Sequence, residues 1–541
     1  MLPRFTLPRP TQPFSPAVLA LVALAFVLPG LTGHDLWKSH DAIGLGIVHE
    51  MARSGEFIVP RVAGLAWLND PPLYHWIAVA CGSALQSLLE FHAAARLASG
   101  AFVLLALWLV YRGARQWGDR AEATAALLLL LGSVGLMVHA HEAVPELATL
   151  AALCGALAAM PRAASDPLAA GTGFGAALGA AFLSSNWVPP AALFVAVAAA
   201  HFACPEWRTR SGVLFIAVSA LIAGVTAALW PLALGSRSPE LFAAWWAVVL
   251  VPQEGFLANL RYFVGTGSWF AWPAWPLALW TLWSLRRRWR EPRLFVPTLA
   301  VLLMIPGIAL WGTVQSVTLI PALAPLVLLA ALGVHTLRRG AVAALDWFGL
   351  VTFAFFTGLV WLGWFAMMTG LPPRVAHNFA RAAPGFVPEF ELLPFLVAAA
   401  LTLGWIYLMF FIPYTTTRSV ARWAAGIVLL WGTFATLWMP WADFQKSYRS
   451  VALQLRSKIP VSAGCMAQRG LGVPQAAALD YHADIRPQRF DIARPQECPL
   501  LLVQGSPRHE FDAPGRGWTK LADVGRPGDR SERYRLYRLN K

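Results

Sequence analysis

The chain has 541 residues, of which 57% are hydrophobic and only 13% are charged, against roughly 25% charged residues in ordinary soluble domains. This composition argues against a soluble protein, and repeated apolar runs of about 20 residues predict a polytopic membrane protein built from helices. The formal net charge of +14 does not indicate a nucleic-acid partner, because Lys and Arg cluster in short loops between the apolar runs, as cytoplasmic anchors do.

The first apolar run, about Pro16 to Leu31, follows Arg4 and Arg9 as a signal peptide would. It lacks a convincing cleavage site, so we expect a retained first helix with its N-terminus inside. The later segment Pro71 to Leu89 is apolar but begins with Pro-Pro, and we expect it to lie in or near the membrane interface. Treating it as a span would place the basic loop Tyr111–Arg120 outside. An odd count of about thirteen spans keeps every basic cluster on one side.

On this topology residues 1–440 form a transmembrane domain whose first periplasmic loop covers residues 34–93. Residues 441–541 are polar and predict a small α/β domain on the same outer side. Within it CPLLLVQG and YRLYRL are typical of strands, and Ser450 to Ile459 is typical of a helix. Cys465 and Cys498 both fall in this domain and either stay reduced or pair, since an oxidising periplasm permits a disulfide.

The first outer loop concentrates the titratable residues of a chain that otherwise has few. Ser39 is a candidate N-cap for a helix with apolar residues at Ile43, Ile47, Val48 and Met51, which predicts an amphipathic helix on the outer membrane surface. Asp41 falls in the first turn of that helix. It is either only a helix-start carboxylate, favoured by the helix dipole, or a general base that accepts a proton from a sugar hydroxyl.

Asp70 precedes Pro71-Pro72, which force an extended turn. Asp70 and His75 then face the same cavity as Asp41, or Asp70 is an ordinary loop acid beside an interfacial aromatic belt that includes Tyr74. Arg261, in the second long outer loop, either holds a phosphate or meets lipid headgroups.

A third polar cluster follows in the turn HAHEAVPE, which contains His139, His141, Glu142 and Glu146. The spacing of its two histidines is wrong for two metal ligands on one helix face, and no cysteine accompanies them. We therefore predict no metal site, and we assign no cofactor, although a divalent cation stays open.

The order of these elements resembles bacterial GT-C glycosyltransferases, the relatives of protein O-mannosyltransferases and of lipid A aminoarabinose transferases. The resemblance rests on four matching stretches: HDAIGL at His40–Leu45, SGEFIVP at Ser54–Pro60, WLNDPPLYHW at Trp67–Trp76 and TLIPALAPLVLLAALG at Thr318–Gly333. It implies a GT-C-like helical membrane domain with a trailing periplasmic domain, in a bacterial inner (plasma) membrane. Where the family has an Asp-Glu pair this chain has His40-Asp41, and Asn69-Asp70 replaces the family's Glu-Lys.

The resemblance implies an inverting glycosyltransferase at the periplasmic face. It would move a monosaccharide from a polyprenyl-phosphate donor, entering among membrane lipids, to a lipid or glycan acceptor such as lipid A or lipopolysaccharide. Asp41 is the expected base. Asp70, His40 or His75 is expected to position the acceptor, Glu146 to bind the sugar hydroxyls, and Arg261 or Lys38 to bind the departing phosphate. Tyr74 is a further expected substrate-binding residue. The alternatives are a noncatalytic envelope-assembly protein and a lipid or sugar transporter (flippase).

Overall fold

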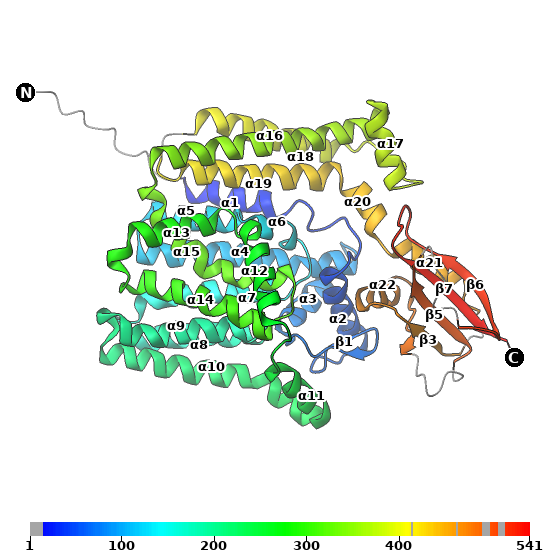
Figure 1. Ribbon diagram of the computed structural model, residues 1–541, viewed down its shortest axis with the longest axis horizontal. Helices are drawn as coiled ribbons and strands as arrows, with labels where there is room; N and C mark the ends of the chain where they lie inside the picture. The colour runs from blue at the N-terminus through cyan, green and yellow to red at the C-terminus, as the bar shows by residue number, and fades with distance from the viewer. Residues whose placement is uncertain (1–13, 413–414, 461–463, 490–497, 507–513, 541) are drawn as a thin grey trace, which may run out of the picture.

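The computed structural model describes residues 14–412, 415–460, 464–489, 498–506 and 514–540. Arg4 and Arg9, on which the expected orientation of the first helix partly depends, lie outside the described residues. The first and larger part of the chain is a bundle of roughly parallel and antiparallel helices, and a small sheet domain lies at one end of it (Figure 1).

Each apolar segment that we expected to span the membrane contains a helix. These helices are α1 (Pro16–Val27), α4 (Phe91–Trp117), α5 (Arg120–Leu131), α7 (Glu146–Ala159), α8 (Pro167–Phe182), α9 (Val188–Ala203), α10 (Arg210–Arg237), α13 (Ala274–Ser284), α14 (Pro292–Trp311), α15 (Leu323–Gly333), α16 (Arg339–Thr369), α18 (Leu392–Phe411) and α19 (Arg418–Leu437). Seven helical stretches in the described residues are long and apolar enough to cross a membrane. The helical polytopic fold is confirmed, and the count of about thirteen stays a prediction.

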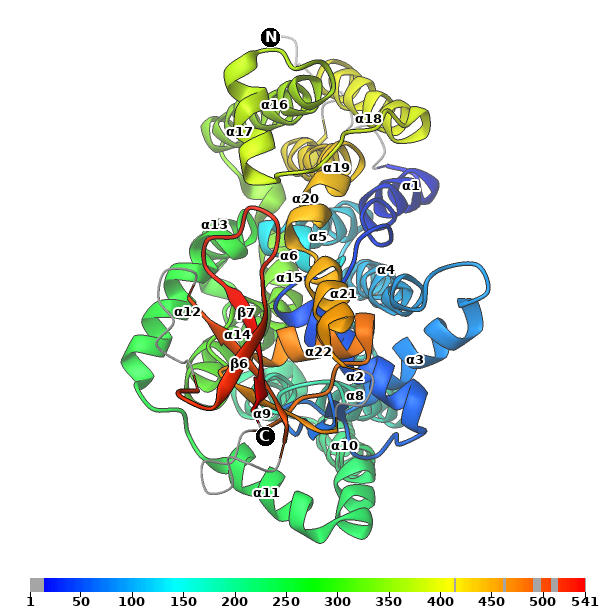
Figure 2. The same cartoon turned by 90° about the vertical axis from the view of Figure 1, so that its right-hand side faces the viewer.

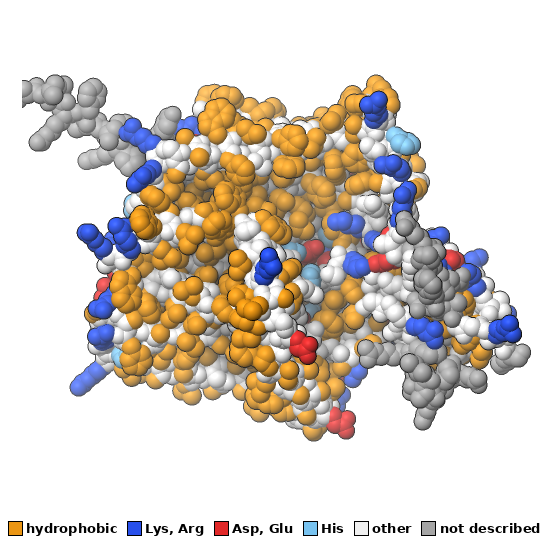
Figure 3. Space-filling view, viewed as in Figure 1, with side chains coloured by type: hydrophobic (Ala, Val, Ile, Leu, Met, Phe, Trp, Pro, Cys, Tyr) orange, Lys and Arg blue, Asp and Glu red, His pale blue; other side chains and the backbone are white. Residues whose placement is uncertain are grey.

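Shorter elements connect the bundle helices. They are α2 (His40–Ser54), α3 (Leu73–Leu85), α6 (Val134–His139), α11 (Pro239–Leu250), α12 (Phe256–Phe270), α17 (Pro373–Ala382), α20 (Met439–Lys446), the hairpin β1 (Arg61–Val62) and β2 (Leu65–Ala66), and the 3₁₀ turns η1 (Met160–Arg162), η2 (Pro205–Trp207), η3 (Arg286–Arg288), η4 (Ser316–Ala322) and η5 (Val334–Thr336). Among them, α3 has 13 residues and is about 20 Å long. It is not one of the seven stretches long and apolar enough to cross a membrane, and its place in the membrane interface stays a prediction. Lys and Arg side chains gather at the end of the bundle opposite the sheet domain (Figure 3), which we call the basic face.

Helix α2 does not lie on the membrane surface, and that expectation was wrong. It is packed between the bundle and the sheet domain (Figure 1, Figure 2), and Ile47, Val48 and Met51 are buried. Gly44 faces the turn before α7: a Cβ there would lie 2.0 Å from the carbonyl oxygen of Ala143. The absence of a side chain at Gly44 is therefore what lets α2 approach this turn.

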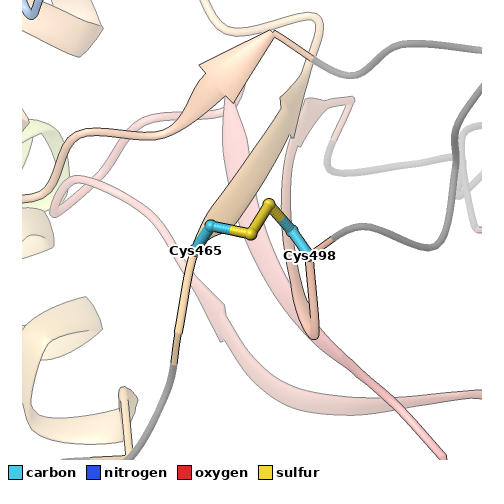
Figure 4. The surroundings of a disulfide bond; sticks show 2 residues. All are labelled: Cys465 and Cys498. Atoms are coloured by element: carbon cyan, nitrogen blue, oxygen red, sulfur yellow. A yellow bond between two sulfur atoms is a disulfide. The ribbon is translucent and has the colours of Figure 1, made fainter.

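The C-terminal domain has a five-stranded mixed sheet in the order β4-β3-β5-β7-β6. Its elements are α21 (Arg449–Lys458), β3 (Met466–Arg469), α22 (Val473–Ala483), β4 (Gln488–Arg489), β5 (Leu500–Gly505), β6 (Trp518–Val524) and β7 (Arg533–Leu539). Strands β3, β4 and β5 are parallel, while β7 pairs antiparallel with β5 and β6. The two predicted strands are β5 and β7, and the predicted helix is α21. Cys465 and Cys498 form a disulfide, with an S–S distance of 2.04 Å (Figure 4).

Charged side chains join the sheet domain to the first outer loop. Arg53 on α2 lies 2.9 Å from Asp480 on α22, and the Arg449 guanidinium lies 2.6 Å from Asp35. Asp443 accepts hydrogen bonds from the Asp35 backbone N–H and from the Trp37 indole N–H. The predicted boundary at residue 441 falls inside α20, which leads from the bundle into this network. The first loop is thus held between two parts of the protein.

Candidate active site

A cavity of about 300 Å³ opens at the end of the bundle away from the basic face. Two carboxylates, Asp70 and Glu146, line it together with amides, hydroxyls and tryptophan rings. Its other lining residues are Leu68, Asn69, Pro71, Phe182, Ser185, Asn186, Trp187, Pro189, Trp245, Val248, Val249, Gln253, Trp311, Thr313, Thr318 and Pro321. The volume is at the lower end of ligand pockets, which run from about 300 to 1,000 Å³. Polar hydrogen-bonding groups between aromatic walls suit a ligand with many hydroxyls.

Asp70 and Glu146 reach the cavity from different elements. Asp70 ends the loop before α3, where Pro71-Pro72 hold the chain extended, and its Oδ2 accepts a 3.1 Å hydrogen bond from the Trp67 indole N–H. Glu146 is the first residue of α7, in the outer turn. Burial raises the pKa of both carboxyls, and the charge of Asp70 raises that of Glu146 further. As the pH rises, Asp70 therefore loses its proton before Glu146 does.

A second group of titratable side chains lies next to this cavity. Nδ1 of His139 lies 2.6 Å from the Glu142 carboxylate, and its Nε2 lies 3.3 Å from the Ser316 hydroxyl. The ring of His40 meets that of His139 edge-on, with centroids 6.5 Å apart. Burial lowers the pKa of His40, although the charge of Glu142 opposes the shift, so its imidazole is neutral at pH 7. Acidic and histidine side chains are visible in a hollow between α12 and the sheet domain (Figure 3).

Two short elements link this group to the cavity. The turn between α6 and α7 carries both Glu142 and Glu146, and the negative charge of Glu142 raises the pKa of Glu146. The turn η4 places Ser316 against His139 and Thr318 in the cavity wall. Asp70, Glu146, Glu142, His139 and His40 therefore form one continuous polar region, to which α2, α6, α7, η4 and the loop before α3 contribute.

Asp41 lies behind this region, not in it. Its side chain is fully buried. Arg96 donates to both of its oxygens, at 2.9 and 2.7 Å, and the backbone N–H groups of Trp37 and Ala143 donate at 3.1 and 2.9 Å. Burial alone raises the pKa of Asp41, but the charge and hydrogen bonds of Arg96 outweigh it and hold the pKa below its usual range. Four donors saturate the carboxylate, so in this conformation it has no oxygen left for a substrate.

The other predicted residues are placed as follows. Tyr74 is buried, and its hydroxyl lies 2.7 Å from that of Ser99, which donates to the Glu142 carbonyl. His75 is buried on α3, and neither ring nitrogen has a partner among the described residues. Lys38 does not line the cavity and forms a 2.5 Å ion pair with Glu532 of the sheet domain.

Arg261 is exposed on α12, on the side opposite the buried Phe263 and Phe270. Helix α12 packs on η4 and α6, but Arg261 does not line the cavity. Within the described ranges Arg261 has no ion-pair partner.

Sequence reasoning missed Arg96 and Lys446. A lone arginine inside an apolar run was a usable signal for Arg96, because a buried charge in such a run needs a partner. Nothing local marks Lys446, which lies 4.3 Å from the centre of the Trp37 ring. Burial lowers the pKa of Lys446 and the charge of Glu142 raises it, so this ammonium lies within electrostatic range of the polar region.

No metal site emerges within the described ranges at the predicted histidine cluster. His141 turns into the core, where its ring bonds the carbonyls of Met137 and Phe26. Among the described residues, the one close set of candidate metal ligands lies elsewhere and consists of Asp35, Glu90 and His92. Arg449 already bridges the two carboxylates of that set, at 2.6 and 3.0 Å. A bound guanidinium opposes a cation at the same place.

Comparison with known proteins supports the resemblance seen in the sequence. No protein-family model matches the chain. Over 241 residues it is 28% identical to undecaprenyl phosphate-alpha-4-amino-4-deoxy-L-arabinose arabinosyl transferase 2 of Pseudomonas fluorescens, covering 42% of this chain and 39% of the relative. Over 116 residues it is 33% identical to the transferase of Pseudomonas savastanoi pv. phaseolicola, covering 21% of each chain. The chain thus matches well under half the length of these curated relatives.

Two solved structures match nearly the whole chain. The crystal structure of ArnT from Cupriavidus metallidurans in the apo state has a TM-score of 0.68 at 18% identity, covering 96% of this chain and 97% of that one. The structure of the same protein bound to undecaprenyl phosphate has a TM-score of 0.67 at 19% identity, with the same coverage. The GT-C-like fold and the likeness to the lipid A aminoarabinose transferases are confirmed. At this identity the structural match establishes the fold alone.

Proposed function

We propose that this protein is a glycosyltransferase that moves a monosaccharide from a polyprenyl-phosphate donor to a cell-envelope acceptor such as lipid A or a related glycan. The observation that carries the proposal is the cavity that holds Asp70 and Glu146, at the end of a bundle with the fold of a protein that binds undecaprenyl phosphate. The names of the curated relatives, which are undecaprenyl-phosphate aminoarabinose transferases, support the same donor class.

In the proposed reaction a hydroxyl oxygen of the acceptor attacks the anomeric carbon of the sugar. The bond from that carbon to the phosphate oxygen breaks, and its electron pair leaves with the polyprenyl phosphate, so the configuration inverts. The hydroxyl proton passes to a carboxylate. A base whose pKa lies near the working pH serves best, and the raised pKa of Asp70 brings it closer to neutrality.

We assign the role of base to Asp70 and the role of hydrogen-bond donor to Glu146. Because Glu146 keeps its proton longer than Asp70, its carboxyl can donate to a sugar hydroxyl while Asp70 accepts a proton. This differs from the assignment of the base to Asp41, which the sequence suggested. In our proposal Asp41 and Arg96 instead hold the turn at Ala143, which leads to Glu146, in place.

The departing phosphate needs a cation to stabilise its developing charge. We keep Arg261 for this role, since it is exposed on α12, a helix that packs on η4, and its guanidinium can meet a phosphate that arrives from the lipid. Lys38 is less suited because Glu532 occupies it. His40, which is neutral, and His139, which is paired with Glu142, are suited to form hydrogen bonds with the acceptor.

We also propose that the cavity and the sheet domain face the periplasm. Basic loops collect at the opposite end of the bundle, as cytoplasmic loops do. The Cys465–Cys498 disulfide fits an oxidising compartment. An alkaline phosphatase fused after the last residue should be active in intact cells, and activity only in lysed cells would reverse the orientation.

The test of the transfer reaction uses the full chain, purified in detergent, with radiolabelled polyprenyl-phosphate sugars and an envelope lipid extract. Asp70→Asn should reduce transfer by about 10²–10⁴-fold, the usual contribution of a general base, with an unchanged melting temperature. Glu56→Gln is the matched control, because Glu56 is a first-loop carboxylate paired with an exposed arginine, Arg237. Full transfer by the Asp70 variant would refute the assignment. No transfer by the wild type from any donor would favour a noncatalytic assembly protein or a flippase.

A further inference from the structure

Helix α17 joins the ends of α16 and α18 that lie away from the basic face (Figure 1). Helix α16 has 31 residues and is therefore about 46 Å long. A bilayer with its headgroup regions is about 40–45 Å thick. Since α16 begins at the basic face, its other end and α17 lie at the level of the opposite headgroups. No residue of α17 lines the candidate active site.

Aromatic rings surround α17, as is typical of the border between hydrocarbon and headgroups. The ring of Phe379 on α17 packs against the rings of Trp438 and Trp441, with its centroid 4.9 Å from each. Near the end of α16, the centroid of the Trp364 ring lies 6.2 Å from that of Phe390. These rings support the placement of α17 at the headgroup level.

Large apolar side chains on both sides of α17 along the chain are open to the surroundings. Each has an exposed fraction between 56% and 74%, and they are Leu371, Val387, Phe390, Leu392 and Leu393. Exposed apolar side chains grouped beside charged ones are typical of a segment that lies in the membrane interface. They favour a lipid over a soluble protein as the partner of this segment.

The face of α17 that points away from Phe379 is polar and cationic. Arg374, His377, Asn378 and Arg381 are exposed, and their spacing of three and four residues puts them on one side of the helix. Arginine and histidine side chains gather over α17 (Figure 3). We call these four residues the outer stripe.

The two arginines of the outer stripe have no counter-charge in the described part of the protein. Arg381 donates a 3.2 Å hydrogen bond to the side-chain oxygen of Asn378, and neither it nor Arg374 forms an ion pair there. Glu389 and Glu391 are exposed acids of the loop before α18, and among the described residues they pair with neither arginine. A planar guanidinium binds phosphate oxygens two at a time. The stripe therefore suits the phosphates of lipid headgroups.

Helix α17 is also held on α20, which leads to the first loop. The Trp441 indole N–H donates to the Phe379 carbonyl, and the Gln445 amide donates to the Ala382 carbonyl, both at 3.3 Å. Helix α20 also carries Asp443, which accepts two hydrogen bonds from the first loop. A ligand that restrains α17 therefore also restrains the helix that supports this loop.

We propose that the outer stripe binds anionic phospholipids of the leaflet away from the basic face. Arg374 and Arg381 are two turns apart, about 10 Å along the helix, so each guanidinium meets the phosphate of a separate headgroup. His377 and Asn378 lie between them and donate to headgroup oxygens. The bound lipids hold α17 against α20. This site is independent of the transfer reaction proposed above.

The experiment is native mass spectrometry of the full protein released from nanodiscs that contain phosphatidylethanolamine with a quarter of phosphatidylglycerol. We expect the wild type to retain two more phosphatidylglycerols than the double variant Arg374→Gln, Arg381→Gln. Each single variant should weaken the retention of one lipid about fivefold, because an arginine near a membrane surface contributes on the order of 1 kcal/mol. Arg381→Lys keeps the charge and should retain both lipids.

The matched control is the double variant Arg516→Gln, Arg538→Gln, which removes the same charge from two exposed positions of the sheet domain. It should retain phosphatidylglycerol as the wild type does. Phosphatidylglycerol should also raise the melting temperature of the wild type and of the control more than that of the Arg374, Arg381 double variant.

Three results would overturn the proposal: retention of the two lipids in their nanodisc ratio by the wild type, full retention of phosphatidylglycerol by the Arg374, Arg381 double variant, or an equal loss in the control. Displacement of the phosphatidylglycerols by a lipid of the envelope extract would assign the outer stripe to the acceptor and would overturn it as well.

Discussion

Replacing Asp41 by asparagine tests whether this residue is structural or catalytic. Arg96 and two backbone N–H groups donate four hydrogen bonds to Asp41, and both side chains are fully buried. Asparagine has one acceptor oxygen, so its NH₂ group would face a donor and Arg96 would lose its counter-charge. Breaking one partner of a buried ion pair costs about 3–5 kcal/mol, and we expect Asp41→Asn to lose stability of that order.

The assay is thermal unfolding in detergent, followed by the fluorescence of the 26 tryptophans, with transfer measured per monodisperse molecule. Glu56→Gln is again the control, because breaking its pair with the 62% exposed Arg237 side chain should cost at most about 1 kcal/mol.

The difference between Asp41→Asn and the wild type should depend on pH. The pKa of Asp41 is held below its usual range. Its stabilising contribution is therefore complete above the unfolded pKa of about 4 and is lost as the pH falls through the lower, folded pKa. An Asp41→Asn protein that melts like the wild type but transfers no sugar would refute this reasoning and return the role of base to Asp41.

Three further predictions concern other parts of the protein. Glu146→Gln should remove the alkaline limb of the pH–rate profile. The raised pKa of Glu146 delays its ionisation, whereas the amide of the variant donates a hydrogen bond at every pH. An unchanged profile would exclude the donor role of Glu146. Gly44→Ala should lower the stability by about 1–3 kcal/mol, since its Cβ meets the Ala143 carbonyl at 2.0 Å, and a wild-type melting curve would contradict the close packing. Reducing the disulfide between Cys465 and Cys498, which are 33 residues apart, should destabilise the sheet domain by about 3–4 kcal/mol, as measured by its proteolysis with and without reductant; equal rates would show that the bridge does not stabilise it.

Much of the fold was determined by local properties of the sequence. The apolar runs predicted the bundle helices because a chain in hydrocarbon has to form its hydrogen bonds within the segment. The charge pattern also predicted that α3 is not a full span, and that prediction stays untested. Strands β5 and β7 followed from short apolar and alternating runs. The prediction failed for α2, whose apolar stripe gives no sign that it packs against a second domain and not against lipid.

The candidate site depended on the tertiary structure. From the sequence we expected Asp41 to be the base and Asp70, in the same loop, to bind the acceptor; nothing within that loop shows which carboxylate faces a cavity. Arg96, 55 residues away from Asp41, saturates its carboxylate. Glu146, the first residue of α7, lines the cavity with Asp70 and adds a second, half-buried carboxyl. Burial and ion pairing depend on partners far away in the chain. The sequence by itself therefore determined which residues are candidates for the chemistry, and only the fold decided which carboxylate faces the cavity.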